Sequence, residues 1–526
     1  MKKIQLKTRL LCAAFVLAAF AFASCTNDAP DTAPDQGDDL NPDETPAETF
    51  TLTTVELASF AGNAGRVTYA TDTRAGDDNA QNPLQLVASI ANPSKNDDSY
   101  FTVEPGGRYM SATSIFYDVA HSKYYVTYHM QGNNYNTSLN TDTAGAIQSF
   151  SFDDSNNTVT LDKGFRAQTP SKLDFDFNHI YFDNTDNRIL TVGHCVNDGN
   201  RKNTNAIVGV FDPAGTYTYA TVKTDKATGE LHDSDDAADV NCIVRTNDAP
   251  TQSGGKTYGW NIYLVATRRG MAALHADQEN LFKPYLNDNG DNYFIATPGS
   301  SKYIAATGTS SWYGLLYLSE EHTGDVAYDT KSQARIAKLS VNTSLDNGLG
   351  HIQGWETPFT HLDPTADIRD FYSQFELPKE ITPIDGKNTL CILGNSEFYA
   401  ALGVNGMYYK NHDAGEGIKR FDSRPVNCVA VDSPLNYSGH SEKGYLYVAN
   451  GSKLTILERS TLKEVASYQA PSKDKDGNAI ASSANFITVV RTDADSNYYD
   501  NTSVRYVAVA FGQEGVKIFK FTPPAQ

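Results

Sequence analysis

The sequence predicts an all-β protein: a β-propeller of seven four-stranded blades, with eight blades as the alternative. Three observations predict this fold. Tyrosine and phenylalanine are abundant, at 30 and 25 residues, and aromatic residues are enriched in strands. Short apolar runs separated by polar turns come in groups of four, and the groups recur at a nearly constant spacing. Four strands in each repeat unit indicate a propeller rather than a stack of helices.

The unit near the C-terminus shows the pattern clearly. Its apolar runs cover residues 426–432, 445–451, 454–457 and 464–468. Four such runs with turn residues between them predict a four-stranded antiparallel meander. The run Tyr445–Gly451 resembles the YVTN type of propeller repeat, in which a Tyr-Val-Ala-Asn-like strand follows an inner strand.

A polar residue before the first apolar run marks the start of five units. The spacing is 64 residues between the first two of these marks, 63 between the next two and 58 between the last two, and the remaining gap of 186 residues equals three units of 62. Less regular copies around residues 314–318 and 390–393 fill that gap, so the chain contains seven units. The five marks are Ser114, Asn178, Asn241, Asn427 and Asn485.

The asparagines in this series have two interpretations. They could form a ring of ligand contacts, or each amide could bond to backbone groups where an inner strand begins. The second interpretation is the stronger one.

The two ends of the chain are expected to share one blade. The last unit has only three strands, because the chain ends shortly after Phe521. An early segment, Thr51–Phe60 or Arg66–Thr71, is expected to supply the fourth strand and so remove exposed strand edges. Residues 61–112 exceed what one strand requires, so they either cap the ring or form an eighth, irregular blade.

Residues 1–24 have the features of a secretory signal: a basic start, a short apolar stretch over 10–22 and small residues before a break. The stretch is short for a membrane span, which needs about 20 apolar residues. The sequence Ala23-Ser24-Cys25 resembles the lipobox of bacterial lipoproteins. That resemblance implies cleavage before Cys25, lipidation of its thiol and a lipid anchor in the membrane; an ordinary secretory leader is the alternative.

Residues 25–49 are predicted to be an unfolded linker. After Cys25 this segment holds eight acids, four prolines and no basic residue, a composition that cannot bury enough apolar surface to fold. Its early acids resemble the signal that sends Bacteroidota lipoproteins to the cell surface. The resemblance implies an outer-membrane protein facing outward, with the periplasmic face as the alternative. Residues 50–526 are expected to form the propeller domain, including its N-terminal closing strand.

Charge and motifs exclude several functions. The net charge of −20 argues against binding nucleic acid through the general field of the protein. The sequence contains no zinc-protease motif, nucleophile elbow or phosphate-binding glycine loop. No catalytic residue, metal site or cofactor is therefore predicted.

Four cysteines lie beyond the leader and Cys25. Each sits inside an apolar run, where free cysteine behaves as a small hydrophobic residue. Buried thiols are therefore expected, although an even number in an exported protein leaves disulfides as the alternative. The four are Cys195, Cys242, Cys391 and Cys428.

Aromatic residues beside polar ones are the candidate ligand contacts. Trp312, Tyr313 and Trp355 lie near predicted loop ends, where flat rings could stack on sugars. A tryptophan that fills the wedge between two blades is the alternative. Arg268 and Arg269 form a basic spot that could hold a carboxylate, or could pair with neighbouring acids.

Two threonines are candidates for modification. Thr32 and Thr143 each lie in an Asp-Thr-Ala sequence. This sequence resembles the one that Bacteroidota modify with O-linked glycans on exported proteins.

Three functions remain compatible with these features. The leading hypothesis is a binding module whose loops and channel mouth contact a glycan, peptide or partner protein. The second is an enzyme, such as a glycan lyase or hydrolase, with residues drawn from several blades. The third is a structural subunit of an outer-membrane complex. Fold alone does not decide between them.

Overall fold

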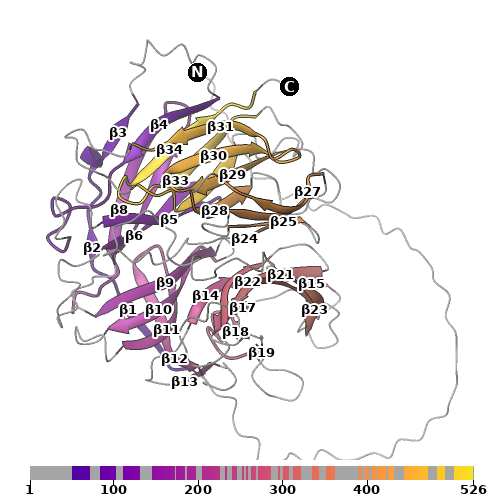
Figure 1. Ribbon diagram of the computed structural model, residues 1–526. Helices are drawn as coiled ribbons and strands as arrows, with labels where there is room; N and C mark the ends of the chain where they lie inside the picture. The colour runs from indigo at the N-terminus through magenta and orange to yellow at the C-terminus, as the bar shows by residue number, and fades with distance from the viewer. Residues whose placement is uncertain are drawn as a thin grey trace, which may run out of the picture. The chain divides into compact units, whose positions relative to one another are not determined.

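A computed structural model shows an all-β chain whose one short helix is a 3-10 turn, η1 (Ala64–Arg66), in the part that the structure describes (Figure 1). No described helix has the length and apolar character needed to cross a bilayer. The described residues are 50–70, 83–101, 110–130, 145–171, 173–183, 186–196, 204–224, 231–233, 240–245, 251–253, 256–258, 262–267, 270–285, 294–296, 300–306, 312–320, 334–342, 351–361, 390–393, 397–401, 406–411, 413–421, 424–431, 444–471, 482–491 and 503–524.

Within the described residues, strand pairing defines seven sheets of four to six strands, and each is named here as a blade after its innermost strand. The β5 blade consists of β5 (Met110–Asp118), β6 (Lys123–Met130), β7 (Ala146–Asp153) and β8 (Thr158–Arg166). The β9 blade consists of β9 (Asp174–Asp183), β10 (Arg188–Val196), β11 (Thr204–Phe211), β12 (Thr216–Thr224) and the short β13 (Leu231–Asp233). The β14 blade consists of β14 (Val240–Arg245), β17 (Ile262–Thr267), β18 (Gly270–His275) and β19 (Phe294–Ala296). A separate ribbon joins β15 (Thr251–Ser253) and β16 (Lys256–Tyr258).

The remaining four blades follow in chain order. The β20 blade consists of β20 (Ser300–Ala306), β21 (Trp312–Glu320), β22 (Ala334–Asn342) and β23 (His351–His361), and the β24 blade of β24 (Leu390–Leu393), β25 (Glu397–Ala401), β26 (Met407–Asn411) and β27 (Gly415–Lys419). The β28 blade consists of β28 (Val426–Val431), β29 (Tyr445–Asn450), β30 (Lys453–Glu458) and β31 (Glu464–Gln469). The β32 blade includes β32 (Phe486–Arg491), β33 (Arg505–Ala510) and β34 (Val516–Phe521). Six blades include described side chains, and the β20 blade is described by its backbone.

The innermost strands follow one another in a closed order. Each of β5, β9, β14, β20, β24 and β28 contacts the innermost strand of the next blade, and β32 contacts β5. Antiparallel four-stranded sheets in such radial repetition make a propeller. The predicted all-β propeller class is therefore confirmed.

The two ends of the chain meet in the β32 blade, but through a different segment from those expected. Its fourth strand is β4 (Leu84–Ile90), which pairs with β34, and β3 (Val67–Tyr69) pairs with the outer side of β4. Asn92, just beyond β4, donates from Nδ2 to the carbonyl oxygens of Met110 at 2.8 Å and Gly512 at 2.9 Å. These bonds fix the end of the closing strand between two blades.

The preceding residues add strands to two further blades. The strand β1 (Leu52–Glu56) pairs with β12, and β2 (Ser59–Phe60) pairs with β8. Neither part of the expected segment Thr51–Phe60 closes the ring, and the described part of 61–112 forms no separate blade. The N-terminal part of the domain instead adds strands to the β9, β5 and β32 blades in turn.

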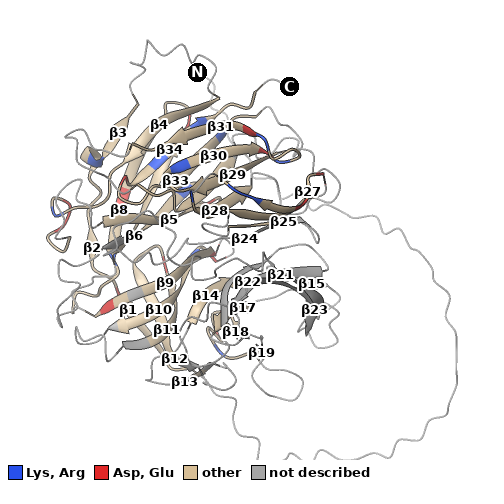
Figure 2. Ribbon diagram, in the orientation of Figure 1, with Lys and Arg blue, Asp and Glu red and all other residues tan. Residues whose placement is uncertain are grey.

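The core lies between neighbouring blades. Alternate strand residues face the next sheet, so Val192 and Val208 of the β9 blade pack in one cluster with Ile243 and Val265 of the β14 blade. The described strands carry few charged residues (Figure 2). Burial of apolar surface between sheets therefore supplies the main stabilising contacts.

A β-bulge interrupts the register of several innermost strands, at three of the asparagines that mark the repeat and at one threonine. Asn178, Asn241 and Asn427 have no opposite residue in the register between their innermost strand and the next strand of the blade. In β5 the residue at the bulge is Thr113. The predicted mark Ser114 is therefore displaced by one residue, because Thr113 and Ser114 are both polar and only the bulge tells them apart.

Two of these asparagines fasten neighbouring blades. Asn427 Nδ2 donates to the carbonyl oxygen of Ala484 at 3.0 Å, and Asn485 Nδ2 donates to that of Ala112 at 2.9 Å. Each acceptor directly precedes the equivalent position of the next blade. Both asparagines are buried, which favours the structural interpretation for this pair.

Candidate functional site

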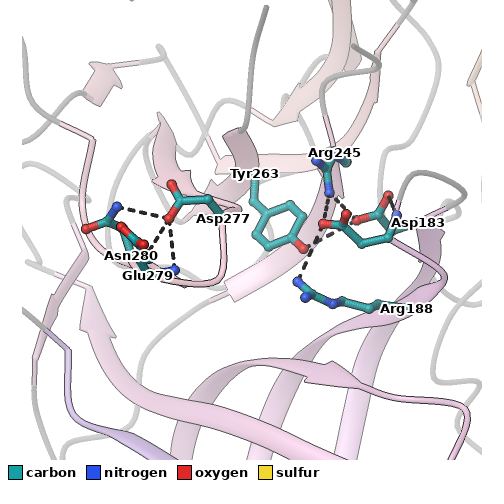
Figure 3. A network of polar contacts seen from close by, with 8 residues as sticks. Asp183, Arg188, Arg245, Tyr263, Asp277, Glu279 and Asn280 are labelled. Atoms are coloured by element: carbon teal, nitrogen blue, oxygen red, sulfur yellow. Dashed lines mark hydrogen bonds and ion pairs between the residues drawn. The ribbon is translucent and has the colours of Figure 1, made fainter. Parts of the chain in front are cut away.

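A polar network lies where β9 and β14 end. Its members, called here the β9–β14 network, are Asp183, Asp186, Arg188, Arg245 and Tyr263. Figure 3 labels all of them except Asp186. Because β9 and β14 are innermost strands, the network belongs to the part of the ring nearest its axis.

The acids of the network come from the hairpin between β9 and β10. Asp183 ends β9, and its Oδ1 accepts a hydrogen bond from the backbone N–H of Asp186 at 3.4 Å. Asn187 then adopts a left-handed conformation with φ 53°, which asparagine tolerates well. Asp118 plays the same turn-forming role between β5 and β6, with His121 as its partner.

Arg245 connects this hairpin to the next blade. Its Nη1 donates to Asp183 Oδ2 at 2.7 Å and to Asp186 Oδ2 at 2.5 Å. Tyr263, opposite Arg245 in the β14–β17 pair, donates from its hydroxyl to Asp183 Oδ2 at 3.3 Å. Two acids and two arginines balance in charge, and this balance makes their burial tolerable.

Burial controls the ionisation of the phenol in this network. Removal from water raises the pKa of Tyr263 far above its usual range, and the charge of Asp183 raises it further. Tyr263 therefore stays a neutral hydrogen-bond donor near neutral pH. For Arg245, burial acts to lower the pKa, but the nearby carboxylates outweigh this effect and raise it.

A histidine and a cysteine also meet between these two blades. His179 Nε2 lies 3.7 Å from Cys242 Sγ, and the backbone N–H of Ile243 donates to His179 Nδ1 at 3.4 Å. Burial lowers the pKa of His179 to about 3, so the ring is neutral. Its Nδ1 lone pair is bonded to Ile243, and the ring proton on Nε2 faces the sulfur. This pair lacks the free basic nitrogen that would activate a thiol.

Three of the four predicted thiols are confirmed as buried thiols that form no disulfide within the described part of the chain. These are Cys195, Cys242 and Cys428. Burial raises the pKa of Cys195 to about 12, which suppresses the reactive thiolate. The side chain of Cys391, in β24, lies outside the described residues.

The predicted aromatic contacts fall within one blade. Trp312 and Tyr313 begin β21, and Trp355 lies inside β23 rather than in a loop. Tyr313 pairs with Val341 and Trp355 with Leu339 across the two sides of β22. Their side chains are not among the described ones, so their contact with a ligand stays a prediction.

The other predicted residues lie outside the described ranges. Arg268 and Arg269 follow the last residue of β17 in the sequence and lie outside the described residues. Their contact with a ligand therefore stays a prediction. Cys25, Thr32 and Thr143 also fall outside the description.

The β9–β14 network escaped sequence reasoning, although a signal for it exists. Asp183 and Arg245 are 62 residues apart, which is one repeat unit. An arginine at the end of an apolar inner strand, one unit after an acid in a turn, could have been read as a contact between blades. Among the described side chains, no group of three or more His, Cys, Asp and Glu could hold a metal ion.

Comparison with known proteins gives weak matches. No family model matches the chain, and no curated protein matches its sequence. A crystal structure of BBS1N in complex with ARL6DN is 8% identical, covers 80% of this chain and 96% of that chain, and has a TM-score of 0.41. A putative 6-phosphogluconolactonase from Bacteroides fragilis is 11% identical, with coverage of 82% and 97% and a TM-score of 0.37. The periplasmic gluconolactonase of Pseudomonas aeruginosa is 10% identical, with coverage of 80% and 97% and a TM-score of 0.39. At these TM-scores none of the likenesses carries an argument, and the propeller fold rests on the strand pairing of this chain.

Proposed function

We propose that this chain is an outer-membrane lipoprotein, anchored through Cys25 and displayed at the cell surface, whose propeller acts as a binding module. Its ligand is a glycan, a peptide or a partner protein. The basic leader, the lipobox-like sequence and the acidic linker support the anchor and its face. The ring of sheets supplies a rigid frame for loops at the strand ends.

One observation carries the preference for binding over catalysis. Between the β9 and β14 blades, the groups whose chemistry would suit an enzyme are engaged in joining the blades: Arg245 is paired with Asp183, and His179 accepts a bond from Ile243. An acid–arginine cluster near the axis is what the enzyme hypothesis expects. In this cluster, however, the fully buried charges neutralise each other and are fixed in place.

Binding is tested with the full chain in detergent on a glycan array, beside a turnover screen on the same polysaccharides. We expect retention of a defined glycan set without release of new reducing or unsaturated ends. Turnover would establish the enzyme hypothesis instead. If neither binding nor turnover occurs, the structural-subunit hypothesis replaces both.

The anchor is tested by the variant C25A. We expect the native chain in the membrane fraction and C25A in the soluble fraction, because several acyl chains on one residue anchor a protein stably. Cys12, within the apolar stretch of the leader, supplies the matched control, since C12A is expected to fractionate like the native chain. Membrane retention of C25A would show that lipidation at this residue is not the anchor.

A further inference from the structure

One carboxylate of the β9–β14 network is shared by two arginines. Asp186 Oδ2 lies 2.5 Å from Arg245 Nη1 and 3.5 Å from Arg188 Nη1. Both guanidinium groups therefore approach the same oxygen atom. Paired arginines are a common way to bind a carboxylate, because their donors match its geometry and charge.

The two acids of the network differ in how firmly they are held. Asp183 is 1% exposed and accepts bonds from Arg245 and Tyr263. The Asp186 side chain is 31% exposed and belongs to the hairpin turn. Asp183 is thus a fixed part of the contact between blades, whereas the carboxylate of Asp186 reaches solvent.

Arg188 has hydrogen-bonding capacity to spare. It is 9% exposed, and its Nη1 has no hydrogen-bond acceptor within the described part of the chain; the contact with Asp186 is a longer ion pair. A buried guanidinium donor without an acceptor is unfavourable. A carboxylate placed closer to Arg188 than Asp186 is would remove this deficit.

From this geometry we infer that Arg188 and Arg245 form a carboxylate-binding site in which Asp186 is the internal occupant. The carboxylate of a ligand replaces that of Asp186. The charge of the site is the same before and after the exchange. The inference deepens the proposed binding function and rests on it.

The charge of the whole chain narrows the ligand class. At −20, the protein repels polyanions through its general field. A single carboxylate on an otherwise neutral molecule, such as one uronic acid unit, meets far less repulsion. We therefore assign the site to monocarboxylates.

The test is calorimetric titration of the full chain in detergent with D-glucuronate, with neutral D-glucose as the matched ligand. The variant D186N keeps the size of the side chain but removes the competing charge. We expect D186N to bind glucuronate at least tenfold more tightly than the native chain and to bind glucose no better. N-acetylglycinate is titrated in parallel, to separate a sugar acid from a peptide-like carboxylate as the source of the group.

The variant R188Q in the D186N background is expected to abolish the gain, since the second guanidinium is then missing. D186S serves the same purpose if D186N fails to fold. Unchanged glucuronate affinity in a folded Asp186 variant would overturn the inference. If glucuronate affinity is unchanged but glycans still bind on the array, only the carboxylate site is wrong and the proposed binding function remains. If no glycan binds on the array, the proposed glycan-binding function is wrong, whatever the titration shows.

Discussion

Replacing Arg245 by methionine is expected to destabilise the protein by about 3–5 kcal/mol, the range for removing one partner of a buried ion pair. The reason is Asp183, which is buried and would lose its charged partner. Urea unfolding followed by tyrosine fluorescence measures the change in the free energy of unfolding.

Two further variants make this prediction specific. K453M removes a cation from the exposed pair of Lys453 with Glu464, so its effect should stay below about 1 kcal/mol. Adding D183N to R245M removes the orphaned charge while keeping an oxygen for the turn, and should recover part of the loss through coupling between neighbours. Equal effects of R245M and K453M would show that Arg245 does not balance a buried charge.

Substitution of Gly515 by alanine should also cost several kcal/mol. Gly515 lies in the turn before β34 with φ +75°, and a Cβ there would lie 2.1 Å from the carbonyl oxygen of Ile90. The left-handed conformation accounts for about 1–2 kcal/mol, and the clash with the end of β4 adds about 1–3 kcal/mol. Thermal and urea unfolding of G515A measure the sum.

Gly415 supplies the matched control, because it separates the two contributions. Its φ is +80°, and nothing lies within 4 Å of the position of its Cβ. G415A therefore carries the backbone strain without a steric clash. Its effect is expected to stay near 1–2 kcal/mol, on the order of the left-handed penalty alone.

The fold class follows from local patterns in the sequence. Four apolar runs per unit and a constant spacing require only that each unit forms a meander with its own neighbours. For the same reason the bulge at Asn427 coincides with the predicted mark, whereas Thr113 and Ser114 were confused by one position. A one-residue offset is invisible where two consecutive residues are both polar.

The closing strand could not be chosen from sequence, because it depends on pairing across the whole chain. Leu84–Ile90 pairs with residues more than 400 positions away, and several N-terminal segments have comparable strand character. Thr51–Phe60 does form strands, but they extend other blades. Local propensity identifies a strand and leaves its partner open.

The site was missed for a related physical reason. Asp183 and Arg245 are ordinary residues of a turn and a strand end, and only the packing of adjacent blades makes them a pair. The residues that the sequence predicts as ligand contacts, such as Trp312 and Tyr313, are neighbours within one segment. In a propeller, the sites near the axis draw on residues one repeat apart.

The strand β4 closes the ring of blades by pairing with β34. The difference in unfolding free energy between G515A and G415A tests this closure most directly, because only the first substitution meets the closing segment. We expect G515A to be less stable than G415A by about 1–3 kcal/mol, the magnitude of a steric clash in a packed interior. Equal destabilisation by the two substitutions would contradict closure of the ring through β4.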